Sequence, residues 1–184
     1  MLIKHSVYQQ AKHNFHIACY REKMSAINKT VGISQMIVSN DISDTIITYS
    51  LGSCLGVTIY DPVAKVGGMI HCMLALSKID LKKATEKPSM FVDIGIPLLF
   101  KSAYALGAEK KRIKLKAAGC AQLMDPTGMF KIGQRNHTVL KKLLWKNSML
   151  IDGESIGESV SRTMILDMKT GVTKIKSMGK IFEI

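Results

Sequence analysis

Two neighbouring segments with alternating apolar residues, 55–60 and 66–74, constrain the fold of this chain more than any other feature. Successive side chains of a strand point to opposite faces, so the apolar residues of the first segment, "LGVTIY", share one face: Leu55, Val57 and Ile59. The second segment, "VGGMIHCML", alternates in the same way. Asp61-Pro62 ends the first segment and begins a short turn. The pattern therefore predicts a hairpin of two strands.

The rest of the chain combines short strands with two long helices. Runs rich in β-branched residues, "QMIVS" and "TIITYSL", predict two strands before the hairpin, and "RIKLKAAG" predicts one after it. An apolar segment predicts a helix from about Ser89 to Leu106, kinked or split by Pro97 and ended by Gly107. The segment "GQRNHTVLKKLLWKN" predicts an amphipathic helix, and the last third returns to strands. This order predicts an α+β domain with mixed or antiparallel sheets.

The length of 184 residues is sufficient for one domain with a substantial core. Residues 1–33 show little periodicity, so we expect an N-terminal extension, partly disordered, followed by a single domain over residues 34–184. No run of eighteen or more apolar residues occurs and no signal peptide is visible, which predicts no membrane insertion. The four cysteines are irregularly spaced, which predicts free thiols in a reducing cytoplasm.

Positive charge is concentrated in the middle of the chain. The formal net charge is +12, and residues 81–150 hold fourteen Lys or Arg against four Asp or Glu. Such a surface attracts polyanions, anionic membranes or an acidic protein, although it is also compatible with a simple solvated face. Aromatic residues are only 6% of the chain and do not alternate with the basic ones, so we expect no nucleic-acid partner.

Two groups of metal-ligand residue types occur, and neither predicts a metal site. His13, His16 and Cys19 would share one face of a helix, but no fourth ligand is evident and such groups are common by chance. The second group fits no zinc spacing: Cys54, His71, Cys72 and Cys120. We expect no metal and no other cofactor.

The predicted hairpin brings Cys54, which directly precedes its first strand, near His71 in its second strand. An imidazole beside a thiol can take its proton and activate the sulfur as a nucleophile. Gly52 and Ser53 leave space at the thiol, and their backbone amides are candidate donors to an oxyanion. The residue types alone nevertheless favour a packing role for Cys54, because cysteine is among the most often buried residues.

A catalytic histidine usually needs a third group that fixes its tautomer. Thr48 is a candidate, because it lies in the strand just before the turn that carries Cys54. Ser50 and Thr58 are alternatives that the sequence leaves open.

The whole run "TYSLGSCLGVTIYDPVAKVGGMIHCML" resembles the signature of the chemoreceptor glutamine deamidases, the CheD family of bacterial chemotaxis. Further segments resemble the family in the same order: "FVDIGIPLLFKSAYALGAEKKRIKLKAAGCAQLM", "FKIGQRNHTVLKKLLWKN" and "DGESIGESVSRTMILDMKTGVTKIK". The resemblance extends from about residue 36 to about residue 177 and excludes the N-terminal extension.

The resemblance implies an α/β sandwich similar to bacterial toxin deamidases. It also implies an amidohydrolase, a protein-glutamine glutaminase, that converts glutamine side chains of methyl-accepting chemotaxis receptors to glutamate and releases ammonia. The family nucleophile matches Cys54, its histidine matches His71 and its threonine matches Thr48. Family members also bind a CheC-type phosphatase of the response regulator, so a non-catalytic module that binds this phosphatase is the main alternative. A thiol protease or transglutaminase shares the Cys–His pair but not this sequence context.

The chain departs from the family pattern at three places. A usual Gly-Gly-Ala run reads Gly119-Cys120-Ala121, a usual Gly-Gly reads Gly157-Glu158, and the residue after the histidine, often aromatic, is Cys72. None of these changes affects the three residues that match the catalytic ones. They concern the shape of the substrate groove and of the partner surface.

Overall fold

The computed structural model describes residues 28–122 and 131–184, which form two five-stranded β-sheets and a layer of helices. The first sheet has the order β1-β3-β8-β9-β10, with β1 at Asn28–Thr30, β3 at Thr45–Leu51, β8 at Arg162–Asp167, β9 at Thr173–Ser177 and β10 at Lys180–Glu183. The second sheet has the order β2-β5-β4-β6-β7, with β2 at Met36–Ser39, β5 at Val66–Cys72, β4 at Leu55–Asp61, β6 at Lys114–Gly119 and β7 at Gly153–Ile156.

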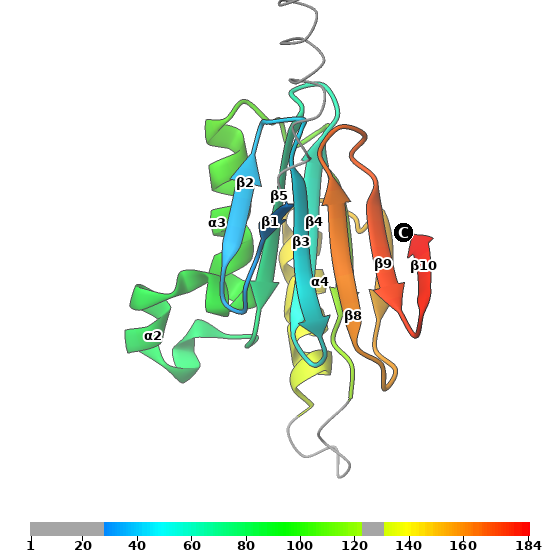
Figure 1. Ribbon diagram of the computed structural model, residues 1–184. Coiled ribbons are helices and arrows are strands. Elements are labelled where there is room, and N and C mark those ends of the chain that lie inside the picture. The colour runs from blue at the N-terminus through cyan, green and yellow to red at the C-terminus, as the bar shows by residue number, and fades with distance from the viewer. Residues whose placement is uncertain (1–27, 123–130) are drawn as a thin grey trace, which may run out of the picture.

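The helices cover the second sheet on the side away from the first sheet (Figure 1). The long helices are α3 (Val92–Ala105) and α4 (Ile132–Lys146), and the shorter elements are η1 (Ser77–Ile79), α2 (Leu81–Glu86) and η2 (Pro88–Met90). Strands β1 and β3 are parallel, as are β6 and β7, and the other pairs are antiparallel. The predicted α+β fold with mixed sheets is therefore confirmed.

Two hydrophobic clusters hold the three layers together. One lies between the second sheet and the helices and includes Leu55, Val57 and Leu99. The other lies between the two sheets and includes Met69 and Met164. The two central strands of the second sheet, β4 and β5, are buried along their whole length, because both of their faces are covered.

The predicted hairpin is confirmed. Strands β4 and β5 pair antiparallel around the turn after Asp61, and the register places Gly56 opposite His71. Residues that lie directly opposite each other point to the same face of a sheet. His71 therefore faces the first sheet, and its neighbour Cys72 packs in the cluster on the helix side.

The helix predicted from Ser89 to Leu106 is divided differently from the prediction. Residues Pro88–Met90 form η2, and α3 begins at Val92 and continues through Pro97. The break lies at Phe91, which is extended, fully buried and bridged to Leu74. Burial of this aromatic side chain therefore ends the first turn upstream of Pro97. Gly107, with φ of +95°, ends α3 as predicted.

The start of the described chain belongs to the first sheet. The predicted N-terminal extension includes residues 28–33, but Asn28–Thr30 pair with β3 and Val31 is buried between the sheets. Residues 1–27, with His13, His16 and Cys19, lie outside the described residues, so the division into extension and domain stays a prediction. None of the helices in the described part of the chain is long and apolar enough to cross a membrane.

Candidate active site

Cys54 lies in a short loop that connects the two sheets. The loop follows the last residue of β3, Leu51, and ends where β4 begins at Leu55. Cys54 is partly exposed, whereas Cys72 and Cys120 are buried. Its side chain packs against the cluster between the sheets, which is the side that His71 faces. Among the cysteines of the described residues, Cys54 therefore has the most accessible thiol.

Three consecutive carbonyl groups fix the backbone of this loop. The Gly52 carbonyl accepts a hydrogen bond of 2.8 Å from the Ala121 amide, and the Cys54 carbonyl accepts one of 2.8 Å from the Cys120 amide. The Ser53 carbonyl accepts one of 3.2 Å from Asn136 Nδ2. By contrast, no hydrogen bond within the described ranges uses the amide N–H of Gly52, Ser53 or Cys54. The loop thus keeps three donors available.

Gly119 allows the close approach of β6 to this loop. Its φ is +100°, and a Cβ at this position would lie 2.3 Å from the Cys54 carbonyl oxygen. Any side chain there would displace the loop. The next residue, Cys120, where the resemblance implies a glycine, has a positive φ of 56°. Glu158, the other position where the resemblance implies a glycine, has φ of +58°, and its carboxylate pairs with the buried Arg162. Both residues therefore have a backbone conformation that favours glycine.

His71 is held by Thr48 from the opposite sheet. The distance between Thr48 Oγ1 and His71 Nδ1 is 2.8 Å, and Thr48 Oγ1 also donates to the Val31 carbonyl at 2.7 Å. A hydroxyl has one proton to donate, and the Thr48 hydroxyl donates it to the Val31 carbonyl. Nδ1 of His71 is therefore the donor in its hydrogen bond with Thr48. This assignment places the ring proton on Nδ1 and leaves the lone pair on Nε2.

The geometry brings Thr48 and His71 into contact, but it does not join Cys54 to His71 by a hydrogen bond. His71 Nε2 is buried and has no hydrogen-bond partner among the described residues. The two groups are neighbours through the hairpin register, because Cys54 comes two residues before Gly56, the partner of His71. Catalytic hydrogen bonds are often long in the free enzyme and tighten on substrate binding.

Burial favours the neutral form of both groups. It raises the pKa of the Cys54 thiol and lowers the pKa of His71 to about 4. At neutral pH, therefore, the free protein holds a thiol and a neutral imidazole instead of a thiolate–imidazolium pair. Nε2 of such an imidazole can accept a proton from an approaching thiol.

The two alternative orienting residues lie elsewhere. Ser50 is exposed, and Thr58 Oγ1 lies 3.0 Å from Thr173 Oγ1. Neither contacts His71 in the hydrogen bonds of the described residues. The structure therefore selects Thr48 from the three candidates by contact.

Sequence reasoning missed Asn136, which contacts the Cys54 loop from α4. Its side chain is fully buried, one helical turn before Leu140 and two before Leu144. A polar residue in line with an apolar stripe was the available signal. Within the described ranges, no group of three or more His, Cys, Asp or Glu side chains is placed to hold a metal ion.

Comparison with known proteins shows the family of the chain. The sequence model of one family, described as "CheD chemotactic sensory transduction", matches residues 73–177. The chain belongs to the CheD family. A CheD relative from Syntrophus aciditrophicus, named as a probable chemoreceptor glutamine deamidase, is 50% identical over 149 residues, which cover 81% of this chain and 93% of the relative.

More distant CheD relatives have the same name. The protein from Solibacter usitatus is 43% identical over 150 residues, covering 82% of this chain and 89% of the relative. The one from Pyrococcus horikoshii is 37% identical over 157 residues, covering 83% of this chain and 95% of the relative. Both are named as probable chemoreceptor glutamine deamidases.

Proposed function

We propose that this protein hydrolyses glutamine side chains of methyl-accepting chemotaxis receptors to glutamate, with release of ammonia and with Cys54 as the nucleophile. The printed names of its relatives support the reaction class. The observation that carries the residue assignment is the Thr48–His71 hydrogen bond of 2.8 Å, which leaves the Nε2 lone pair of His71 free on the side of the sheet where Cys54 packs. The proposal places the protein in the cytoplasm.

In the proposed first step, Cys54 Sγ attacks the carbonyl carbon of the glutamine carboxamide. His71 Nε2 takes the thiol proton as the S–C bond forms, so neither group needs to be charged beforehand. The carbonyl oxygen becomes an oxyanion, which accepts hydrogen bonds from the loop amides. Gly52 and Ser53 are candidate donors, together with Cys54. The amides of Ser53 and Cys54 belong to peptides whose carbonyls are fixed by Ala121 and Asn136.

In the second step, the imidazolium N–H of His71 protonates the leaving nitrogen, which departs as ammonia when the C–N bond breaks. The acyl group remains on Cys54 as a thioester. His71 Nε2 then takes a proton from a water molecule that attacks the thioester, and the proton returns to the sulfur as the C–S bond breaks. One water is consumed, and one glutamate and one ammonia are formed for each glutamine.

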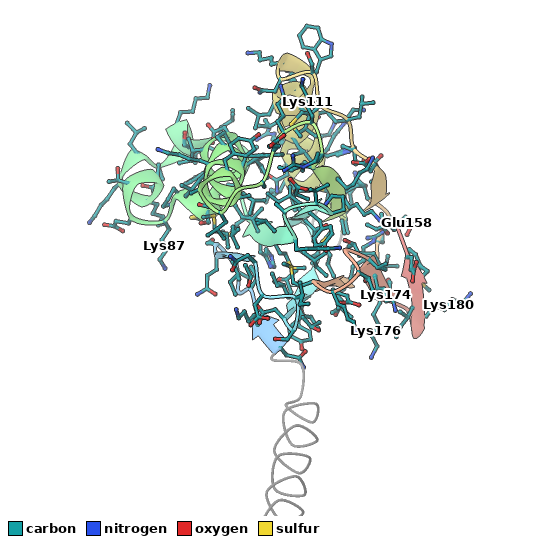
Figure 2. All side chains as sticks on the ribbon, turned by 90° about the horizontal axis from the view of Figure 1, so that it is seen from above. Lys87, Lys111, Glu158, Lys174, Lys176 and Lys180 are labelled. Atoms are coloured by element: carbon teal, nitrogen blue, oxygen red, sulfur yellow. The ribbon has the colours of Figure 1, made fainter. Side chains whose placement is uncertain are left out.

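Docking of the receptor needs a surface that can hold a segment of the receptor. The resemblance implies long acidic helical bundles as substrate, which a basic groove would attract. Figure 2 shows Lys87 and Lys111, two basic residues of segment 81–150, on different parts of the surface. A groove of about 440 Å³ lies between the chain after β5 and α4, and its lining includes Lys78, Ile79 and Arg135. We propose this groove as the docking surface.

The docking proposal is tested by reversing charge at the groove. Lys78→Glu with Arg135→Glu should weaken receptor binding at low salt, because a basic groove would become acidic. The matched control is Lys174→Glu with Lys176→Glu on β9 of the first sheet, which keeps the same change of net charge (Figure 2). Equal effects of the two double variants, or no effect of either, would refute the groove as the docking surface.

The resemblance also implies a CheC-type phosphatase as a binding partner, and we keep this partner as part of the proposal. Mass spectrometry of a receptor signalling domain incubated with the protein separates the enzyme from a non-catalytic partner module. Each glutamine that is converted exchanges an amide NH₂ for an acid OH and raises the receptor mass accordingly. Acid quenching during turnover should also reveal receptor covalently attached to Cys54.

Cys54→Ala should abolish the mass change, because no other group supplies the sulfur nucleophile. Cys72→Ala is the matched control, because it removes a thiol from the neighbouring strand β5 on the opposite face. Full activity of Cys54→Ala contradicts the mechanism, and an unchanged receptor mass with the wild-type protein contradicts the enzyme.

A further inference from the structure

Asn136 is a buried polar residue at a position where the helix pattern favours an apolar one. It lies on α4 with no exposed side-chain surface. Its Nδ2 donates two hydrogen bonds, one of 3.2 Å to the Ser53 carbonyl and one of 3.1 Å to the Met73 carbonyl. Its Oδ1 is buried without a hydrogen-bond partner in the described part of the chain. An unpartnered buried carbonyl costs free energy, and this cost offsets part of what the two hydrogen bonds of Nδ2 contribute.

The two carbonyls that Asn136 holds belong to the two segments that carry the proposed catalytic pair. Ser53 directly precedes Cys54, and Met73 follows His71 by two residues. The two bonds connect α4 to these segments across 83 and 63 residues of sequence. One side-chain amide therefore joins the loop of the thiol to the strand of the imidazole.

The bond to Ser53 also determines where the Cys54 amide points. The Ser53 carbonyl and the Cys54 N–H belong to one planar trans peptide, in which the two groups point in opposite directions. Asn136 draws the carbonyl toward α4, so the Cys54 N–H points away from α4. That N–H donates no other hydrogen bond among the described residues. Donation to the carbonyl also polarises the peptide and makes its N–H a stronger donor.

The first turn of α4 lies close enough to the backbone at Cys120 for the Asn136 side chain to contact the Cys54 loop. A Cβ at Gly133 would lie 2.3 Å from the Cys120 carbonyl oxygen, so only glycine lets the first turn of α4 lie this close to the backbone. Cys120 in turn donates its amide to the Cys54 carbonyl. The same close contact therefore places Asn136, three residues after Gly133, beside the Cys54 loop.

We propose that Asn136 is a positioning residue for the deamidation: it directs the Cys54 amide toward the oxyanion and fixes the spacing between the Cys54 loop and the His71 strand. This inference rests on the proposed function. Asn136 touches neither the substrate nor the reacting atoms, and it acts through the Ser53–Cys54 peptide and through Met73.

Asn136→Ala should lower kcat by about 10- to 100-fold with little change in KM, because small misplacements at a reacting centre cost up to about 100-fold in rate. The matched control is Asn147→Ala at the end of the same helix. That change removes a hydrogen bond of 2.8 Å from Asn147 Nδ2 to the Leu143 carbonyl, far from Cys54 in the helix sequence. It should leave kcat unchanged. Both variants are assayed well below their unfolding temperatures, which are measured in parallel.

The rate at which iodoacetamide alkylates Cys54 in the absence of receptor is a second measurement. A change in stability alone should not alter this rate in the folded protein. In Asn136→Ala, the alkylation rate and its pH profile should change, because the spacing between Cys54 and His71 is released; Asn147→Ala should match the wild type. A folded Asn136→Ala protein with wild-type kcat and wild-type alkylation would overturn the proposal. This readout does not depend on receptor turnover, so failure of the proposed function, seen as full activity of Cys54→Ala, is distinguished from failure of this inference.

A second variant keeps the test decisive where the alanine variant does not fold. Asn136→Gln retains the two-proton amide and moves it by one methylene group, so it should fold and show a kcat between those of the wild type and the alanine variant. Loss of the folded state in both variants would assign Asn136 to stability alone and would also overturn the proposal.

Discussion

The two ends of the β4–β5 hairpin are equally buried but differ in whether their buried polar groups have hydrogen-bond partners. At the turn end, the Asp61 carboxylate accepts hydrogen bonds from the amides of Val63, Ala64 and Glu109, and from the Arg112 guanidinium. At the open end, His71 Nε2 has no partner among the described residues. Burial is the same at both ends, since Asp61 is 0% and His71 is 1% exposed.

We infer from this difference that the turn end contributes to stability and that the open end holds the proposed catalytic groups. Burial alone would raise the pKa of Asp61, but the Arg112 guanidinium and three backbone amides outweigh it and hold that pKa well below its usual range. The turn end thus holds an ionised carboxylate whose two oxygens both accept hydrogen bonds. The open end combines a base, a thiol and unused amide donors, and these groups gain partners when a substrate enters.

The largest expected effect is at the open end. His71→Gln should lower kcat by about 10²- to 10⁴-fold, because a positioned acid–base group contributes a factor of this size. The glutamine amide can still donate to Thr48 Oγ1 in place of Nδ1, so the variant should remain folded at neutral pH. Ammonia release with receptor substrate gives the rate. His137→Gln on α4, where the imidazole lies 2.9 Å from Glu154, is the control and should retain activity. Equal losses in the two variants would contradict the assignment.

The matching change at the turn end should affect stability and not chemistry. Asp61→Asn removes the buried charge that pairs with Arg112 at 2.9 Å and should lower the free energy of unfolding by about 1.5–3 kcal/mol, the range for hydrogen bonds to a charged group. Urea unfolding measures this loss. Activity per folded molecule should stay at the wild-type level, because Asp61 lies at the far end of β4 from Cys54. A large drop in kcat of the folded variant would break the contrast between the two ends.

The two ends should also respond to acid in separate pH ranges. His71 has a folded-state pKa of about 4, below its unfolded value of 6.5, so its contribution to stability is complete above pH 6.5 and is lost as the pH falls toward 4. This loss amounts to up to about 3 kcal/mol at 1.36 kcal/mol per pKa unit. Asp61 also has a lowered pKa, so its contribution is present above the ordinary carboxyl value of 3.8 and is lost at lower pH.

Urea midpoints measured from pH 7 to pH 2 resolve the two ranges. His71→Gln should show a shallower loss between pH 6.5 and 4 than the wild type, and Asp61→Asn a shallower loss below pH 4. Identical pH profiles of wild type and His71→Gln would show that this histidine is not buried in its neutral form.

Local patterns in the sequence predicted the hairpin but not what surrounds it. Alternation and the Asp61-Pro62 turn are short-range signals, and they predicted the pairing of β4 with β5, in which Cys54 comes two residues before Gly56, the partner of His71. Thr48 could not be separated from Ser50 and Thr58, because that choice depends on how the first sheet stacks on the second. Contacts of this kind join residues distant in the chain and leave no periodicity in either segment.

The same limit explains the two features that were missed. Asn136 reaches the Cys54 loop across 83 residues of sequence, and only its position in an apolar stripe marked it. Strand β1 consists of three residues, Asn28–Thr30, which is too short to show an alternating pattern. It is nevertheless important for the site, because the residue just after it, Val31, supplies the carbonyl that accepts the hydrogen bond from the Thr48 hydroxyl.

The smallest expected effect concerns this link between the sheets. Thr48→Val keeps the shape of the side chain and removes the hydroxyl, so His71 Nδ1 loses its acceptor at 2.8 Å. The imidazole can then carry its proton on Nε2, a tautomer that cannot accept the thiol proton from Cys54. One neutral hydrogen bond is worth about 0.5–1.5 kcal/mol, which corresponds to a fall in kcat of up to about tenfold. Ammonia release under saturating receptor measures it, and Thr48→Ser should restore most of the rate.

Thr58→Val separates this effect from a general loss of buried hydrogen bonds. Thr58 is also buried between the sheets, and its hydroxyl lies 3.0 Å from that of Thr173 instead of from the imidazole. Its substitution should lower stability by a similar amount and leave kcat unchanged. If both valine variants lose the same rate, the hydroxyl of Thr48 acts only by holding the sheets together, and the tautomer of His71 is fixed by some other group. If only Thr48→Val lowers kcat, the tautomer of His71 depends on Thr48 in the opposite sheet. The packing of the two sheets against each other then determines the reactive form of the imidazole.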